Sequence, residues 1–115
     1  MLQFSKQDRL LNEAEFTQVK NNGIKVGGES IFLSFLPGPR KRLGVIVSKK
    51  VGNAVIRNKI KRIMRDFFRV NRQDFLSGDF VFVAKNQAAK QTSQELRQQI
   101  AKLLQRLSKK TENKT

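Results

Sequence analysis

Residue types that could perform acid–base or metal chemistry are sparse in this chain of 115 residues. It contains no histidine and no cysteine, so the commonest general base, a thiolate nucleophile and the usual zinc ligands are missing. The nine carboxylates are scattered along the sequence, and Glu13 and Glu15, two apart, suit a helix start. A two-metal nuclease needs carboxylates that converge on ions roughly 4 Å apart. We therefore expect no catalytic residue and no metal ligand here, which disfavours an autonomous nuclease.

The basic residues, in contrast, are concentrated and regularly spaced. The net charge is +15, and twelve Lys and Arg lie between Arg40 and Arg72 against the single carboxylate Asp66. Basic residues recur at positions 57, 61, 65 and 69, and like charges at this helical spacing repel one another. A nucleic-acid phosphate backbone would relieve that repulsion and is the expected partner. An anionic membrane surface is the alternative, but no stretch approaches the roughly 18 apolar residues of a spanning helix.

A two-faced helix over residues 54–69 must position these cations. Asn53 precedes it and can cap its first turn. Its apolar stripe, which should pack on a core, comprises Ile56, Ile60, Ile63, Met64 and Phe67. Its opposite face comprises Arg57, Asn58, Lys61, Arg62, Arg65 and Arg69. Asn58 is either a contact to a 2′-hydroxyl or base edge, or an exposed amide without a special role.

Two further helices are predicted from capping boxes. Asn12 with Glu15 begins a short helix that Gly23 can end as a C′ residue. Thr92 with Glu95 begins a terminal helix. The short helix should turn Ala14, Phe16, Val19 and Lys20 inward, and the terminal one should bury Leu96, Ile100, Leu103, Leu104 and Leu107.

Four strands complete the prediction. Apolar or β-rich runs place them near 24–27, 30–36, 43–48 and 79–84, with 40–42 as a basic loop and a turn at 77–78. The order α-β-β-β-α-β-α predicts an α+β fold, a two-layer α/β sandwich. We expect a single domain over residues 1–108 and a polar, disordered tail over 109–115.

Two more groups of residues are candidates for RNA contact. Phe16 could stack on an unpaired base, or it could belong to the core. Ser48, Lys49 and Lys50 follow a strand and could bind a phosphate backbone, or they could form a turn that is basic without consequence. The absence of a signal peptide and of cysteine favours a cytoplasmic protein.

Residues 42–65 (RLGVIVSKKVGNAVIRNKIKRIMR) closely resemble the signature of the bacterial ribonuclease P protein subunit. The opening helix with Gly23, the strand running from Asp79 to Lys85 and the terminal helix fit the same family. The resemblance implies a small mixed sheet with a left-handed β-α-β crossover. It also implies an RNA-binding cofactor of an endoribonuclease, whose catalytic RNA and Mg²⁺ remove the 5′ leader of precursor tRNA, while the protein alone does not cleave. A structural RNA-binding protein, such as a ribosomal one, is the alternative that composition leaves open.

The resemblance also assigns residues to two RNA partners, the catalytic RNA and precursor tRNA. It does not imply a protein partner, and the lack of a long apolar stretch leads us to expect no membrane partner. The Arg-Asn-Arg motif of the family corresponds to Arg57, Asn58 and Lys59, and the last of these loses the bidentate fork. Lys61, Arg62, Arg65 and Arg69 continue this surface for the catalytic RNA. Phe16, Lys20, Ser48, Lys49, Lys50 and Lys85 match a cleft for the leader. Lys20 and Ser34 stand where relatives often have aromatic residues, so charge should replace stacking there.

Overall fold

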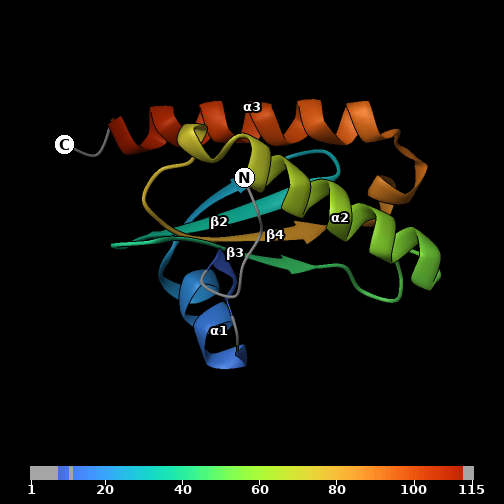
Figure 1. Cartoon of the computed structure of the whole chain (residues 1–115), viewed down its shortest axis with the longest axis horizontal. Coiled ribbons are helices and arrows are strands. Elements are labelled where there is room, and N and C mark those ends of the chain that lie inside the picture. The colour runs from blue at the N-terminus through green and yellow to red at the C-terminus, as the bar shows by residue number, and fades with distance from the viewer. Residues whose placement is uncertain (1–7, 11, 113–115) are drawn as a thin grey trace.

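The computed structural model describes residues 8–10 and 12–112. Its elements are α1 (Glu13–Asn22), β1 (Ile24–Gly27), β2 (Ile31–Pro37), β3 (Lys41–Ile46), α2 (Ala54–Val70), β4 (Gly78–Ala84) and α3 (Ser93–Glu112), with short 3-10 helices at Arg72–Asp74 and Asn86–Lys90. The predicted order α-β-β-β-α-β-α is confirmed. Helices α2 and α3 cover one face of the sheet, and α1 packs against the other (Figure 1).

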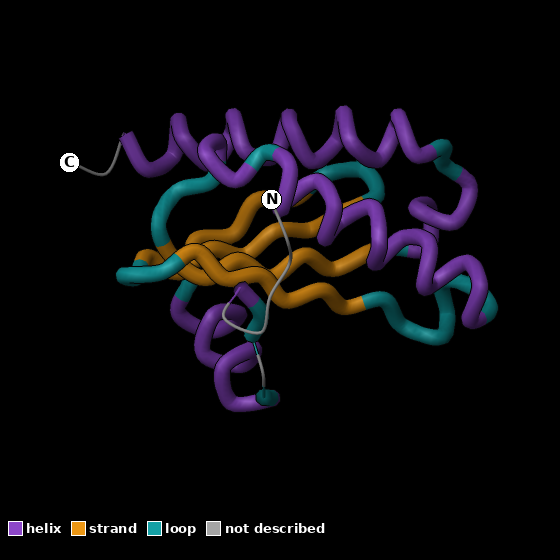
Figure 2. Tube along the Cα trace, in the orientation of Figure 1, coloured by secondary structure: helices purple, strands orange, loops and turns teal. Residues whose placement is uncertain are grey.

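The sheet is mixed, as predicted. Its strand order is β1-β2-β4-β3. β2 pairs antiparallel with both β1 and β4, whereas β3 pairs parallel with β4. Helix α2 therefore connects two neighbouring parallel strands, β3 and β4, and Figure 2 shows it lying over the sheet. The left hand of this crossover, opposite to the usual rule, stays a prediction.

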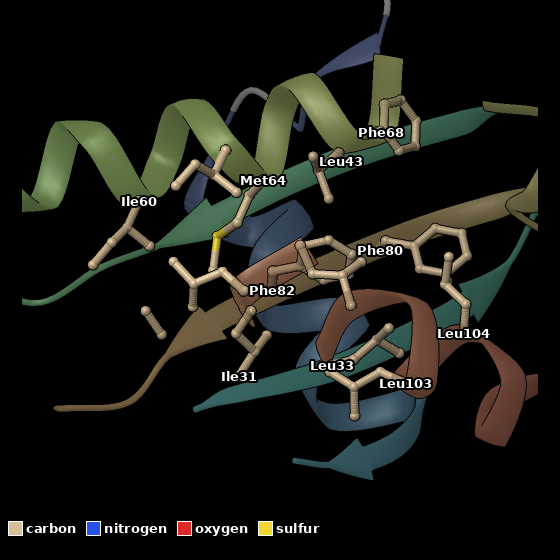
Figure 3. Close-up of a cluster of buried hydrophobic side chains, with 14 of the residues drawn as sticks. Ile31, Leu33, Leu43, Ile60, Met64, Phe68, Phe80, Phe82, Leu103 and Leu104 are labelled. Atoms are coloured by element: carbon tan, nitrogen blue, oxygen red, sulfur yellow. The ribbon is translucent and has the colours of Figure 1, made fainter. Parts of the chain in front are cut away.

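The main core lies between the sheet and the pair α2 and α3. Ile60, Met64 and Phe68 point from α2 toward the sheet residues Phe80 and Phe82 (Figure 3). The sequence prediction placed Phe67 on the buried stripe and missed Phe68, which is fully buried. Phe67 is half-buried at the edge of the core instead, because the buried row follows steps of four residues through Ile60 and Met64.

The capping box of α1 is confirmed, since Glu15 N–H donates to Asn12 Oδ1 over 2.9 Å and Asn12 N–H to Glu15 Oε1 over 3.2 Å. Gly23 ends α1, with its N–H donating to Val19 O over 2.8 Å. Its backbone is extended (φ −83°) rather than left-handed. Glycine is needed there because a Cβ would lie 2.5 Å from Val19 O and 2.7 Å from Phe35 O.

Several expectations about side-chain burial and element ends differ from the structure, including the end of β3, which comes at Ile46 and not at the predicted Ser48. Ala14 and Lys20 are exposed rather than inward, and only Val19 of α1 is fully buried. β3 begins at Lys41, two residues before the predicted start, because its pairing with β4 extends to Gly78. α3 stays helical through Glu112, into the predicted tail, and residues 113–115 lie outside the described part of the chain.

Candidate nucleic-acid interface

The first part of the interface is the basic face of α2. Asn53 caps this helix, since its side chain accepts from Ile56 N–H over 3.0 Å. Arg57 is held near the same end because its Nε donates to Gly52 O over 3.1 Å. Asn58, Lys59 and Arg62 are exposed, whereas Arg57, Lys61, Arg65 and Arg69 are partly exposed. The structure thus brings all seven predicted contacts onto one helix that presents its cations outward.

The positive charge on this face of α2 is scarcely neutralised by carboxylates of the same helix. Asp66 is the only carboxylate in its sequence, and it lies 3.7 Å from Arg69. At that distance and exposure an ion pair contributes little. Arg57, Lys61 and Arg65 follow one another at steps of four residues with no anion between them. The basic face of α2 is therefore suited to a polyanion.

The second part lies on the opposite face of the sheet, which α1 covers only in part. The strand registers align four residues across it, from β1 to β3: Gly27, Phe32, Val83 and Ile46. We call these residues the open row, because Phe32, Val83 and Ile46 are only half-buried and Gly27 is exposed. The neighbouring row under α1, which contains Ser34, Val81 and Gly44, is buried. The open row is thus an apolar floor beside α1.

Phe16 of α1 lies beside this apolar floor. Its ring lies directly on β3, where a Cβ at Gly44 would meet Phe16 Cε1 at 2.4 Å. Phe16 is half-buried and packs against a cluster that includes Leu10 and Val19. It also lines a hollow of about 390 Å³ with Asn12, Glu13, Thr17, Lys20 and Ile46, which we call the α1 hollow. Phe16 is therefore both a packing residue and an exposed aromatic surface.

The other predicted leader contacts surround the floor. Ser48, Lys49 and Lys50 are exposed in a turn that follows β3, closed by Val51 N–H donating to Ser48 O over 3.1 Å. Lys85 is exposed after β4, and its Nζ donates to Gly28 O over 2.6 Å. The turn and Lys85 thus follow the adjacent ends of two parallel strands, whereas Lys20 lines the α1 hollow itself.

The sequence prediction expected less stacking at Ser34 and named no contact from it to the leader. Ser34 is fully buried beneath α1, and its hydroxyl has no hydrogen-bond partner among the described residues. It cannot contact a leader there. Phe32, which the sequence prediction did not single out, shares the face of Leu36 by the alternation of a strand. The predicted strand spanned both residues, so its alternation already indicated that Phe32 and Leu36 share a face.

An ion-pair network centred on Arg42 fixes α1 to the sheet. Arg42 donates to Asp79 through Nε and Nη2, both over 2.8 Å, and to Glu15 through Nη1 over 2.7 Å. The hydrogen bonds to Asp79 raise the pKa of the Arg42 guanidinium, against the opposing effect of burial, and Glu15 raises it further. We call this network the Arg42 clamp. It joins α1, β3 and β4 through side chains of these three elements.

Two absences concern the described part of the chain. Within residues 8–10 and 12–112, no three His, Cys, Asp or Glu side chains gather as a metal ion would require. None of the helices formed by these residues is long and apolar enough to cross a membrane.

Known proteins resemble the chain over nearly its whole length. The family model described as Ribonuclease P matches residues 4–108. The ribonuclease P protein component of Geotalea uraniireducens is 35% identical over 108 residues, covering 92% of this chain and 96% of that protein. The one from Desulfosudis oleivorans is 42% identical over 111 residues, covering 92% and 90%.

Solved structures agree with the sequence comparisons. The Staphylococcus aureus RNase P protein superposes with a TM-score of 0.83 at 31% identity, covering 87% of this chain and 94% of that one. The Thermotoga maritima RNase P protein gives a TM-score of 0.77 at 28% identity, covering 85% and 96%. Sequence, fold and the basic α2 signature thus lead to one conclusion: this chain belongs to the ribonuclease P protein family.

Proposed function

We propose that this chain is the protein subunit of ribonuclease P and acts in processing the 5′ end of tRNA in the cytoplasm. It binds the catalytic RNA through the basic face of α2 and the 5′ leader of precursor tRNA in the α1 hollow and along the open row. The observation that carries this proposal is the presence of two different RNA-compatible surfaces on opposite faces of one sheet.

The basic face of α2 suits a folded RNA. It is a rigid helix of 17 residues anchored by a buried apolar side, so its cations keep fixed spacings. Arg side chains bind phosphate oxygens through a planar fork, and Lys adds point charge. Asn58, exposed beside Arg57, adds an amide that can bond to a 2′-hydroxyl.

The α1 hollow and the open row suit a single strand. Phe16 and Phe32 offer aromatic surface, which stacks on unpaired bases of any sequence. Lys20, Lys49, Lys50 and Lys85 border this surface and can track a phosphate backbone. A duplex has its bases paired and stacked internally, so it could not use the apolar floor.

The protein contributes binding, and the catalytic RNA with its Mg²⁺ supplies the chemistry. Glu13 is the one carboxylate among the residues that line the α1 hollow, and the carboxylates of Glu15 and Asp79 both accept from Arg42. Added cations offset repulsion between two RNAs, which is greatest when magnesium is scarce. The subunit should therefore raise leader removal most at low magnesium.

The test uses purified protein and precursor tRNA, with and without the catalytic RNA. We expect no cleavage by the protein alone at any magnesium concentration, and faster cleavage by the assembled particle than by RNA alone at low magnesium. Leader removal by RNA-free protein, surviving controls for contaminating nuclease, would revive the autonomous nuclease. Binding without any gain in cleavage would favour a structural RNA-binding protein.

A further inference from the structure

A third cationic surface lies at the β1 edge of the sheet. β1 is an outer strand, and its free edge exposes backbone carbonyls. Arg106 Nη1 donates to Gly27 O over 2.6 Å, and Lys110 Nζ donates to Lys25 O over 2.8 Å. Two cations of α3 are thus held at fixed places along the strand edge.

Further cations extend this surface around the edge. Lys85 Nζ donates to the next carbonyl, Gly28 O, over 2.6 Å. Lys102 and Arg106 line a hollow of about 220 Å³ with Gly28 and Glu29. Lys25, Lys85, Lys102, Arg106 and Lys110 are all exposed, and we call them the β1-edge cations. Glu29 is the one carboxylate lining that hollow, so the cations outnumber it.

The close approach of α3 to this edge depends on a glycine. A Cβ at Gly28 would lie 2.9 Å from Gln99 Oε1 and 3.1 Å from Leu103 Cδ2. Gln99 in turn accepts from the N–H groups of Ser30 and Ile31, the latter over 3.0 Å. α3 is therefore packed closely against this edge, and Arg106 and Lys110 are held beside β1.

The open row leads directly to these cations. It runs from Ile46 on β3, beside the α1 hollow, to Gly27 on β1, whose carbonyl holds Arg106. Neighbouring strands lie about 4.8 Å apart, so the row is about 14 Å long. A stacked strand advances about 3.4 Å per nucleotide, so about four nucleotides cover the row. Any nucleotide beyond these would reach the β1 edge.

We propose that the β1-edge cations extend the leader path: nucleotides of a long 5′ leader leave the open row at Gly27 and bind by their phosphates to Lys102, Arg106 and Lys110. This inference rests on the proposed binding of the leader and adds a dependence on leader length. Because the contacts are to phosphates, they are independent of base sequence.

The test compares precursors of one tRNA with leaders of about four and about twelve nucleotides, lengths that end within or beyond the open row. The variant Lys102→Gln/Arg106→Gln/Lys110→Gln removes the α3 cations from an exposed face. Wild-type particles, assembled with the catalytic RNA, should bind the long leader more tightly. The variant should lose that difference in affinity. The log–log salt slope for the long leader should fall by about 2, because each of the three lost single-strand phosphate contacts contributes about 0.7.

Matched controls separate this inference from the proposed function. Arg97→Gln removes an exposed cation from another side of α3, in the groove beside Asp66 and Val70, and should keep the length dependence. Lys102→Gln alone leaves the hydrogen bonds of Arg106 and Lys110 to β1 in place, so it serves as the test if the triple variant misfolds. It should reduce the dependence of affinity on leader length. Binding of the short-leader precursor relative to mature tRNA reports the open row and should survive all three changes.

Two results would overturn the extended path. One is a wild-type particle that binds both leaders equally. The other is a triple variant that loses affinity equally for the long leader, the short leader and mature tRNA, which would assign the β1-edge cations to the catalytic RNA or the tRNA body. If instead wild type cannot distinguish the short-leader precursor from mature tRNA, the proposed leader site itself fails.

Discussion

At the residue scale, Phe16 combines packing with exposure. Its ring lies on Gly44 within a small apolar cluster, and the same ring lines the α1 hollow. Phe16→Ala should weaken binding of precursor tRNA by the assembled particle by up to about 1–3 kcal/mol, the range for one base stacked on one aromatic. Mature tRNA, which lacks a leader, should bind the variant and wild-type particles alike. Paired titrations of the two tRNAs measure this difference.

The control for Phe16→Ala must separate lost stacking from lost packing. Phe16→Leu keeps much of the apolar volume over Gly44 but removes the aromatic face, so it should preserve the melting temperature better while still weakening precursor binding. Equal weakening for precursor and mature tRNA, or unfolding without any change in binding, would make Phe16 a core residue only.

Arg42 presents a second residue-scale question, because its guanidinium is occupied within the protein. It makes two hydrogen bonds to Asp79 and one to Glu15. Arg42→Lys keeps the charge but cannot form the fork, so we expect a loss of about 2 kcal/mol in the free energy of unfolding, the range for hydrogen bonds to charged groups. Because the Arg42 clamp holds α1, precursor binding should weaken, whereas affinity for the catalytic RNA should hold.

Denaturant unfolding and the two binding titrations check the Arg42→Lys prediction. Arg40→Lys, at an exposed neighbouring position outside β3, is the matched control and should change neither quantity. If Arg42→Lys weakened catalytic-RNA binding and left stability unchanged, Arg42 would be an RNA contact and not a clamp.

At the element scale, α2 has two faces with opposite roles. Ile60 is buried against the sheet core, whereas Arg65 belongs to the basic face. Ile60→Ala should lower the free energy of unfolding by about 2–5 kcal/mol, and Arg65→Ala should change it by less than about 0.5 kcal/mol. Comparable losses in thermal melts of the two variants would mean that the faces are misassigned.

The basic face of α2 should also dominate the salt dependence of binding to the catalytic RNA. Replacing Arg57, Lys61, Arg62 and Arg65 by Gln should weaken that binding and lower the log–log salt slope by about 0.7–0.9 per lost phosphate contact. Lys90→Gln, an exposed cation on the 3-10 helix before α3, is the control for a general change in charge. An unchanged slope in the fourfold variant would move the catalytic RNA to another surface.

Periodicity and capping were enough to predict most elements. The capping boxes at Asn12 and Thr92 and the two-faced pattern of α2 are local signals, and the structure confirms each. The errors arose where a tertiary contact determines the end of an element or which side chain is buried. β3 starts early because β4 offers Gly78 as a partner, and Phe68 replaces Phe67 because the position of α2 on the sheet selects the buried row.

The candidate site was predictable in part for the same reason. The basic face of α2 lies on a single helix, so the sequence alone placed its seven residues together. The open row needs four strands in register, and no periodicity within β2 shows that Phe32 would adjoin Val83. The burial of Ser34 likewise depends on the position of α1 over the sheet, which the sequence does not show.

At the scale of the whole molecule, the sheet separates the two surfaces that we propose for RNA. α2 lies on one face and α1 on the other (Figure 1), and no residue of α2 lines the α1 hollow. Changes at sites more than about 7–10 Å apart with no shared partner usually add within about 0.3–0.5 kcal/mol. Substitutions on one surface should therefore leave the binding free energy at the other surface unchanged.

Combining Phe16→Leu with Arg62→Ala tests this independence. Arg62 is exposed on α2, so its loss should raise the protein concentration needed to assemble the particle. Once the catalytic RNA is saturated with protein, precursor affinity should equal that of Phe16→Leu alone, because α2, which carries Arg62, lies on the other face of the sheet from α1. The measurement is a double-mutant cycle of precursor binding at saturating protein, with mature tRNA as reference. A coupling energy above about 1 kcal/mol would mean that one RNA spans both surfaces or that the sheet shifts when either is occupied.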